Sequence, residues 1–173
     1  MNLIYAKNLA EKYKAILAPF CKRIEIAGSI RREVPIVKDI ELVCIPTSKY
    51  AFEFAEIVNK WTKRKGEALG KYTQRILPEG VMLDLFICTD KTWACNFFIR
   101  TGSADFNAAV MKYAAAKNFQ FKDAQLFKKE QDEYGSCQID KSPKCEKDVF
   151  SLLGLRFLPP AARLHGGSLQ KLI

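Results

Sequence analysis

The chain has 173 residues, 49% of them hydrophobic, which is enough for one domain, or one and a half, with a substantial core. Its net charge of +9 favours a polyanionic partner, although a merely soluble basic protein would have the same balance. Charged residues within 1–20 argue against a signal peptide, and no apolar run approaches the length of a membrane span. We therefore expect no membrane association and an intracellular location, in cytoplasm, nucleus or virion.

In the first half of the chain, the hydrophobic pattern predicts helices and strands that alternate. Apolar residues recur at helical spacing over 2–18, and Pro19 ends the run. A short strand over 23–27 leads into a turn at Gly28 and Ser29. The other elements expected here are a strand over 39–45, a helix over 50–61, a basic connection over 63–67, and strands over 71–77 and 81–88 that form a hairpin.

The pattern changes after Asp90. The spacing of apolar residues predicts a helix over 103–117, and Ser103 is suited to be its N-cap. The other elements expected here are strand-like pieces within 119–139, a charged loop over 128–135 between them, and a last helix over 146–153 that Gly154 ends. Taken together, the elements predict a chain of the α+β class.

Two carboxylates stand close to a turn that suits phosphate binding. Asp39 and Glu41 are two residues apart at the start of an apolar strand, so their side chains point to the same face. Two acids side by side are costly unless a cation lies between them. Mg²⁺ binds few protein carboxylates and completes its shell with phosphate oxygens and water. Upstream, the glycine-serine turn and the two arginines that follow it are suited to hold phosphate.

Asp84 is a third acid, in the middle of the apolar strand expected over 81–88. Alone, it could also be an ordinary acid on a solvated strand face. Beside Asp39 and Glu41 it completes an oxygen-rich site for two divalent ions, one to activate an attacking hydroxyl and one to hold a triphosphate. Together with the phosphate-holding turn, the three acids indicate a nucleotidyltransferase that binds a nucleoside triphosphate against a sheet.

These residues resemble the signature of the polymerase-beta-like nucleotidyltransferases, and two further motifs narrow the resemblance to the family X DNA polymerases. The motifs are Gly28–Arg32, the acids at 39, 41 and 84, Arg100–Asn107, and Leu153–Pro160, in the order of that family. The resemblance implies a nucleotidyltransferase palm over 1–95, a mixed β-sheet with helices on one face, and a small α/β thumb subdomain over 96–173. It implies a minimal form of palm and thumb, without the lyase domain and fingers subdomain usual in the family.

The resemblance also implies a function, that of a DNA-directed DNA polymerase adding dNTPs to a primer 3′-hydroxyl in short gaps during DNA repair. Asp39, Glu41 and Asp84 would be catalytic and would bind two Mg²⁺ ions, for which Mn²⁺ can substitute, with Asp84 as the base for the 3′-hydroxyl. In the nucleotide site, Ser29 and Arg32 would hold phosphates. The nucleotide-binding residues implied by the motifs are Gly28, Ser29, Arg32, Thr101, Gly102, Ser103 and Asn107.

Three features depart from the family pattern. Glu41 stands where the polymerases usually have aspartate, so the metal spacing must adjust. Met82 replaces an arginine that often orients the third acid, and Arg75 on the neighbouring strand is a candidate substitute. Ile99 and Arg100 replace two aromatic residues that help to exclude ribonucleotides, so measurable ribonucleotide insertion is expected.

Contact with DNA is expected from basic side chains, because phosphate contacts give affinity without sequence choice. The palm residues expected to bind DNA are Lys63, Arg64, Lys65 and Lys71. The expected partners are gapped or primer–template DNA and a dNTP, with the protein a monomer. Two alternatives stay open: a template-independent nucleotidyltransferase acting on RNA ends, a small molecule or a protein, and a catalytically impaired DNA-binding module of the same fold.

Overall fold

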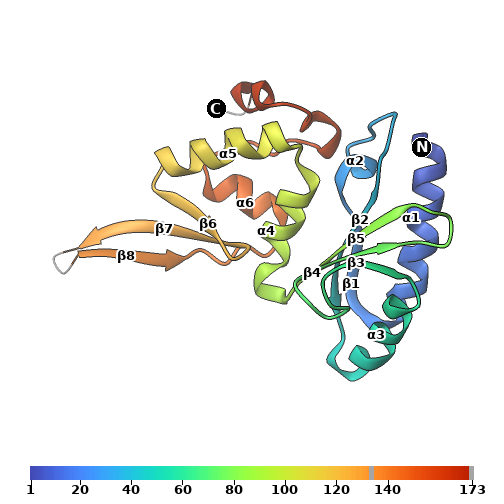
Figure 1. The fold of residues 1–173 in the computed structure, drawn as a ribbon. Coiled ribbons are helices and arrows are strands. Elements are labelled where there is room, and N and C mark those ends of the chain that lie inside the picture. Colours follow the sequence, from blue (N-terminus) through green and yellow to red (C-terminus); the bar gives the residue numbers. More distant parts are fainter. Residues whose placement is uncertain (133–134, 172–173) are drawn as a thin grey trace. The chain divides into compact units, whose positions relative to one another are not determined.

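The chain forms two units, Met1–Thr89 and Asp90–Ile173, in a computed structural model that describes residues 1–132 and 135–171 (Figure 1). The two units divide six residues before the boundary expected after residue 95, which falls inside helix α4, Asp90–Thr101. Within the described ranges, no helix combines the length and the apolar character needed to cross a membrane.

The first unit contains a five-stranded mixed sheet in the order β1-β2-β5-β4-β3 (Figure 1). Strands β2 and β5 are parallel, and the other neighbouring pairs are antiparallel. The strands are β1 Cys21–Ile26, β2 Ile40–Pro46, β3 Thr62–Lys65, β4 Tyr72–Ile76 and β5 Met82–Ile87. The helices are α1 Leu3–Leu17, α2 Gly28–Arg31 and α3 Ala51–Asn59, with short 3₁₀ turns at Ala18–Phe20 and Ser48–Tyr50.

The core of this unit lies on one face of the sheet. Buried side chains of α1 and α3, such as Leu9 and Phe54, pack in one cluster with Leu42 of β2 and Leu85 of β5. Because side chains alternate along a strand, the neighbours of these residues, among them Glu41 and Asp84, point to the opposite face. The sequence prediction of a mixed sheet with helices packed on one face is therefore confirmed.

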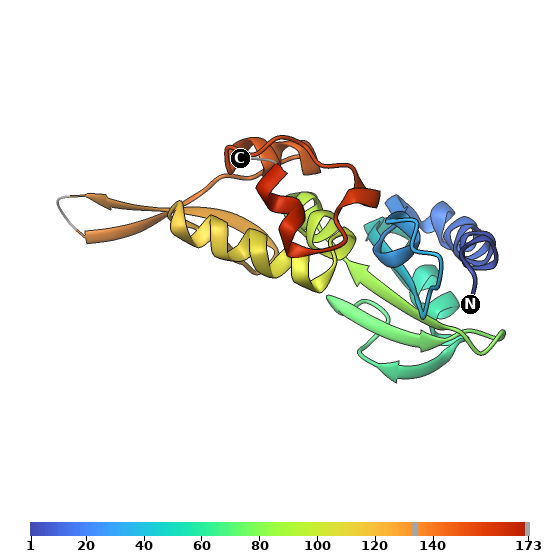
Figure 2. The same cartoon turned by 90° about the horizontal axis from the view of Figure 1, so that it is seen from above.

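In its described residues, the second unit combines three α-helices with an antiparallel sheet (Figure 1 and Figure 2), whose strand order is β6-β7-β8. Phe98, Phe106 and Phe150 come from different helices and meet in a second hydrophobic core. The strands β7 and β8 form a long hairpin that extends beyond the end of α5. The further bounds are α5 Ala104–Ala116, β6 Phe119–Lys122, β7 Gln125–Asp132, β8 Gly135–Asp140, α6 Glu146–Leu152, and 3₁₀ turns at Pro160–Ala162 and Gly166–Lys171.

The local helix signals of the second unit are confirmed. The side chain of Ser103 caps α5 by accepting a hydrogen bond of 3.1 Å from the Phe106 N–H, which otherwise has no partner in the first turn. Gly154 follows α6 with φ +71°, a left-handed conformation that favours glycine at a helix end.

The sequence prediction missed helix α4. Trp93, Ala94, Cys95, Phe97 and Phe98 are all buried, so the buried residues are not confined to a narrow stripe of the helix. Without such a stripe, the 3.6-residue period of a helix is weak in the sequence.

Two segments predicted as connections are strands instead. The basic connection over 63–67 supplies most of β3, which pairs with β4 at the sheet edge. The charged loop over 128–135 was also wrong, because β7 continues to Asp132 and β8 begins at Gly135, while 133–134 lie outside the described residues. Strands β3 and β7 are held by backbone hydrogen bonds and carry many charged side chains, so their sequences show no alternation of polar and apolar residues.

Candidate active site

The parallel pairing of β2 and β5 brings two of the expected acids together. Glu41 lies directly beside Asp84 in the register, and both side chains lie on the face opposite the core. Neighbouring strands are about 4.8 Å apart, so their side chains are within interaction range. Asp39 is the residue immediately before β2, two positions before Glu41. All three acids are half-buried.

The electrostatics of this cluster reflect crowded negative charge. Burial and then the nearby charge of Asp84 raise the pKa of Asp39, and they outweigh the opposing effect of Arg32. Burial lowers the pKa of Arg32, against the opposing attraction of Glu41 and Asp39. The three acids and Arg32 therefore influence one another electrostatically.

The turn between β1 and β2 presents small polar groups to the same cluster. Gly28 has φ +62°, and a Cβ atom at this position would lie 1.7 Å from Oε2 of Glu41. Only glycine allows the Glu41 carboxylate to pack this closely against the turn. The next residue, Ser29, has a buried hydroxyl oxygen that finds no hydrogen-bond partner among the described residues. Such an unsatisfied hydroxyl is suited to bind an oxygen of a ligand.

Two neutral side chains of β4 hold the third acid. The Tyr72 hydroxyl donates a hydrogen bond of 2.9 Å to Oδ1 of Asp84, and Nε2 of Gln74 donates one of 2.8 Å to the same oxygen. The Tyr72 ring is stacked on Phe86, with ring centroids 5.2 Å apart and an interplanar angle of 21°. Sequence reasoning missed both donors, because the antiparallel register that places Gln74 opposite Asp84 is not visible in the chain order.

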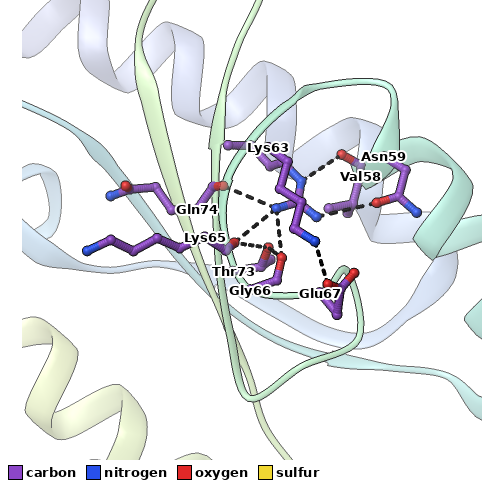
Figure 3. A network of polar contacts seen from close by, with 9 residues as sticks. Val58, Asn59, Lys63, Lys65, Gly66, Glu67, Thr73 and Gln74 are labelled. Atoms are coloured by element: carbon purple, nitrogen blue, oxygen red, sulfur yellow. Dashed lines mark hydrogen bonds and ion pairs between the residues drawn. The ribbon is translucent and has the colours of Figure 1, made fainter.

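The suggestion that Arg75 orients Asp84 was wrong. Arg75 follows Gln74 on β4, so its side chain points to the other face, where it is 0% exposed. There it ties α3 to the end of β3 and the residue that follows, through acceptors that are labelled in Figure 3. The acceptors of its hydrogen bonds are the carbonyl groups of Val58, Lys65, Gly66 and Gln74, at 3.1–3.2 Å, and Oδ1 of Asn59, at 3.3 Å.

The remaining residues expected to bind nucleotide belong to the second unit. Thr101 is buried at the end of α4, and Gly102 and Ser103 make the turn into α5. Asn107 closes this turn, because its Nδ2 donates hydrogen bonds of 2.7 Å to the Ile99 carbonyl and 3.4 Å to the Gly102 carbonyl. A Cβ atom at Gly102 would lie 2.2 Å from Oδ1 of Asn107, so any larger residue would displace the Asn107 side chain from this turn. Contact of Asn107 with an incoming base stays a prediction.

The basic residues expected to bind DNA are exposed at one edge of the first sheet. Lys63, Arg64 and Lys65 lie on the edge strand β3, and Lys71 immediately precedes β4. Lys63 forms an ion pair with Glu67, four residues on. Charged edge strands also discourage edge-to-edge association of sheets, so the exposure of these residues does not by itself indicate DNA.

The chemistry of the three acids fits Mg²⁺. Carboxylates are the hard oxygen ligands that this ion prefers, and a cation would relieve the repulsion that raises the pKa of Asp39. Over residues 1–132 and 135–171, however, no three His, Cys, Asp or Glu side chains are arranged to hold one ion in common. Metal binding therefore stays a prediction that rests on residue type and position.

A comparison with protein-family models matches residues of the second unit. Residues 97–164 match the family model described as DNA polymerase beta thumb. A search of curated proteins finds no match to the chain.

The thumb match and the fold together indicate a kind of protein. The chain is a mixed α+β protein, consistent with a nucleotidyltransferase-like palm plus a thumb domain. The thumb match supports a relationship to the polymerase-beta-like, family X enzymes and a DNA polymerase-related function with DNA binding.

Proposed function

We propose that the protein is a DNA-directed DNA polymerase of family X that adds dNTPs to a primer 3′-hydroxyl in short gaps. One juxtaposition carries the proposal. The acids Asp39, Glu41 and Asp84 gather on one face of a mixed sheet, in a chain whose residues 97–164 match a polymerase thumb. The acid cluster supports nucleotidyl transfer, and the thumb match favours DNA as the substrate.

Within this proposal, Asp39, Glu41 and Asp84 would hold two Mg²⁺ ions, which when bound lower the pKa of an attacking hydroxyl and stabilise the leaving pyrophosphate. Asp84 would accept the proton of the 3′-hydroxyl, because it is half-buried and its hydrogen-bond donors Tyr72 and Gln74 are both neutral. Ser29 and Arg32 would bind phosphate oxygens, the first through its buried hydroxyl and the second through its planar guanidinium.

The proposal is tested with a gapped primer–template, each dNTP supplied singly, and Mg²⁺ or Mn²⁺. We expect template-matched extension that Asp84→Ala reduces by at least about a thousandfold, or ~4 kcal/mol, because the variant lacks the proton acceptor. DNA binding, measured by fluorescence anisotropy, should change little. The matched control is Glu56→Ala, which removes an exposed acid from α3 and should leave extension unchanged.

Other outcomes select other functions. Nucleotide addition that ignores the template base would support a template-independent nucleotidyltransferase, the second candidate, because that class uses the same acids without a DNA template. DNA binding without extension by the wild-type chain would indicate an impaired DNA-binding module. Either result would overturn the polymerase proposal.

A further inference from the structure

We propose that Tyr72 and Gln74 are positioning residues that together hold the carboxylate of Asp84 in its reactive orientation. The proposal rests on the proposed function, since it assigns the two side chains a role in the chemistry of Asp84. It goes beyond that function because neither residue belongs to the acid motifs or to the glycine-serine turn.

The sheet register places the three groups in one row. Gln74 on β4 lies directly opposite Asp84 on β5, and Asp84 lies directly beside Glu41 on β2. Asp84 therefore has an amide donor on one side and a second carboxylate on the other. The donor side can fix the carboxylate while the other side stays directed toward the remaining acids.

Both hydrogen bonds reach the same oxygen of Asp84. Tyr72 and Gln74 donate to Oδ1, at 2.9 and 2.8 Å, and neither engages Oδ2. Two donors on one oxygen restrict rotation about the side-chain bonds of Asp84, because any rotation would lengthen at least one hydrogen bond. Oδ2 thus stays available to a proton or a cation while its position is held.

The donor hydroxyl of Tyr72 is itself held in place. Tyr72 lies opposite Phe86 in the β4–β5 register, and the two rings are stacked. Stacking restricts rotation of the Tyr72 ring, so packing as well as the hydrogen bond holds the hydroxyl close to Asp84.

The two donors are neutral, and this affects the charge of the site. A cationic side chain in their place would hold Asp84 but would also repel a bound Mg²⁺ and cancel part of the negative charge that attracts it. A phenol and an amide orient the carboxylate without either effect. The donors therefore hold Asp84 without adding positive charge to the acid cluster.

The energetics favour a role in positioning over a role in folding. Tyr72 and Gln74 are half-buried on the face opposite the core, so loss of one hydrogen bond should lower the stability of the folded chain only slightly. By contrast, displacement of a reacting group by about 1 Å can cost roughly a hundredfold in rate. The two roles thus predict different ratios of activity loss to stability loss.

The test compares Tyr72→Phe, Gln74→Leu and the double variant with the wild-type chain. Tyr72→Phe keeps the ring and removes the hydroxyl, and the control Tyr5→Phe makes the same change at a tyrosine that is 46% exposed on α1. In single-nucleotide extension we expect kcat to fall about tenfold for each single variant and about a hundredfold for the double variant. The KM for the dNTP should stay within about twofold, because the phosphate-binding groups are untouched.

A second readout does not depend on activity. The ¹³C resonance of the Asp84 carboxyl group should shift in Tyr72→Phe and in Gln74→Leu at neutral pH, and should not shift in Tyr5→Phe. If the wild-type chain extends primers but the double variant keeps full kcat, the positioning proposal is overturned and the polymerase proposal stands. If the wild-type chain transfers no nucleotide, the polymerase proposal fails. In that case an unshifted Asp84 resonance also overturns the positioning of this carboxylate, and a shifted one supports it.

Discussion

Asp39 carries a carboxyl group that the folded chain disfavours in its charged form. Burial and the charge of Asp84 both raise its pKa. A raised pKa means that the folded state binds the proton more tightly than the unfolded state does. The resulting stabilisation is therefore present at low pH and is lost as the pH rises through the raised pKa. At neutral pH, the free chain pays a cost in stability for keeping this acid beside Asp84.

Replacing Asp39 with asparagine should remove that cost. In the absence of divalent cations, we expect Asp39→Asn to be more stable than the wild-type chain at pH 7, by less than about 1 kcal/mol because the half-exposed site is screened by water. The difference should vanish at low pH, where Asp39 is protonated. Thermal unfolding between pH 4 and 8 measures it, with Glu56→Gln as the control for loss of an exposed acid.

Asp39→Asn should also lose nucleotidyl transfer, because Asp39 is one of the proposed metal ligands. Residues that serve a reaction often reduce the stability of the folded chain. Mg²⁺ should raise the melting temperature of the wild-type chain more than that of Asp39→Asn. A variant that is less stable than the wild-type chain at pH 7 would contradict this account of Asp39.

At the scale of elements, the two edge strands of the first sheet offer a matched comparison. Strand β3 exposes Lys63, Arg64 and Lys65, and β1 at the opposite edge exposes Lys22 and Arg23. Lysines on an edge strand protect a sheet from association, so both edges have a reason to be basic without any ligand. DNA binding is proposed for the β3 edge and not for the β1 edge.

Charge reversal separates these explanations. The triple variant Lys63→Glu/Arg64→Glu/Lys65→Glu should weaken DNA binding by about tenfold or more at low salt, and the salt dependence of the affinity should become shallower because fewer phosphate contacts remain. The control reverses Lys22, Arg23 and the exposed Lys49, again two lysines and one arginine, so the net charge changes equally. Anisotropy titrations from 50 to 200 mM salt measure both effects. Equal loss in the two triple variants would remove β3 from the proposed DNA surface.

At the scale of the whole molecule, each unit has its own hydrophobic core. The second core also encloses an ion pair. Nη1 of Arg163 lies 2.6 Å from Oε1 of Glu146, and the two side chains are 0% and 7% exposed. The guanidinium also donates a hydrogen bond of 2.8 Å to the Leu158 carbonyl and packs over the rings of Phe98 and Phe150. This pair fastens the C-terminal segment to α6.

Arg163→Met should destabilise the second unit by about 3–5 kcal/mol, because it leaves a buried carboxylate without its cation. Hydrogen exchange measured by mass spectrometry should accelerate in peptides of 90–171 and change little in peptides of 1–89. The double variant Glu146→Leu/Arg163→Met should recover part of the loss, since it also removes the buried charge. Equal acceleration in both units would show that they unfold together.

Much of the first unit was predictable because its signals are local. The apolar runs over 39–45 and 81–88 predict the strands, and the two-residue spacing along them predicts the faces of Glu41 and Asp84. In the second unit, the Ser103 cap predicts the start of α5. Helix α4 and strand β3 were not predictable in this way. The buried residues of α4 do not form a narrow stripe, and β3 is an exposed, charged strand held by backbone pairing with β4.

The amino-acid sequence alone determined which side chains share a strand face, because that depends only on residues two positions apart. It therefore specified that the side chains of Asp39 and Glu41 lie on the same face. It also specified that the side chain of Asp84 lies on the face opposite those of its two chain neighbours. Only the tertiary structure decided that β2 lies beside β5 with Glu41 next to Asp84, that Gln74 and Tyr72 reach Asp84, and that Arg75 does not. The physical reason is that strand pairing and register are set by the packing of residues far apart in the chain, which no local pattern records.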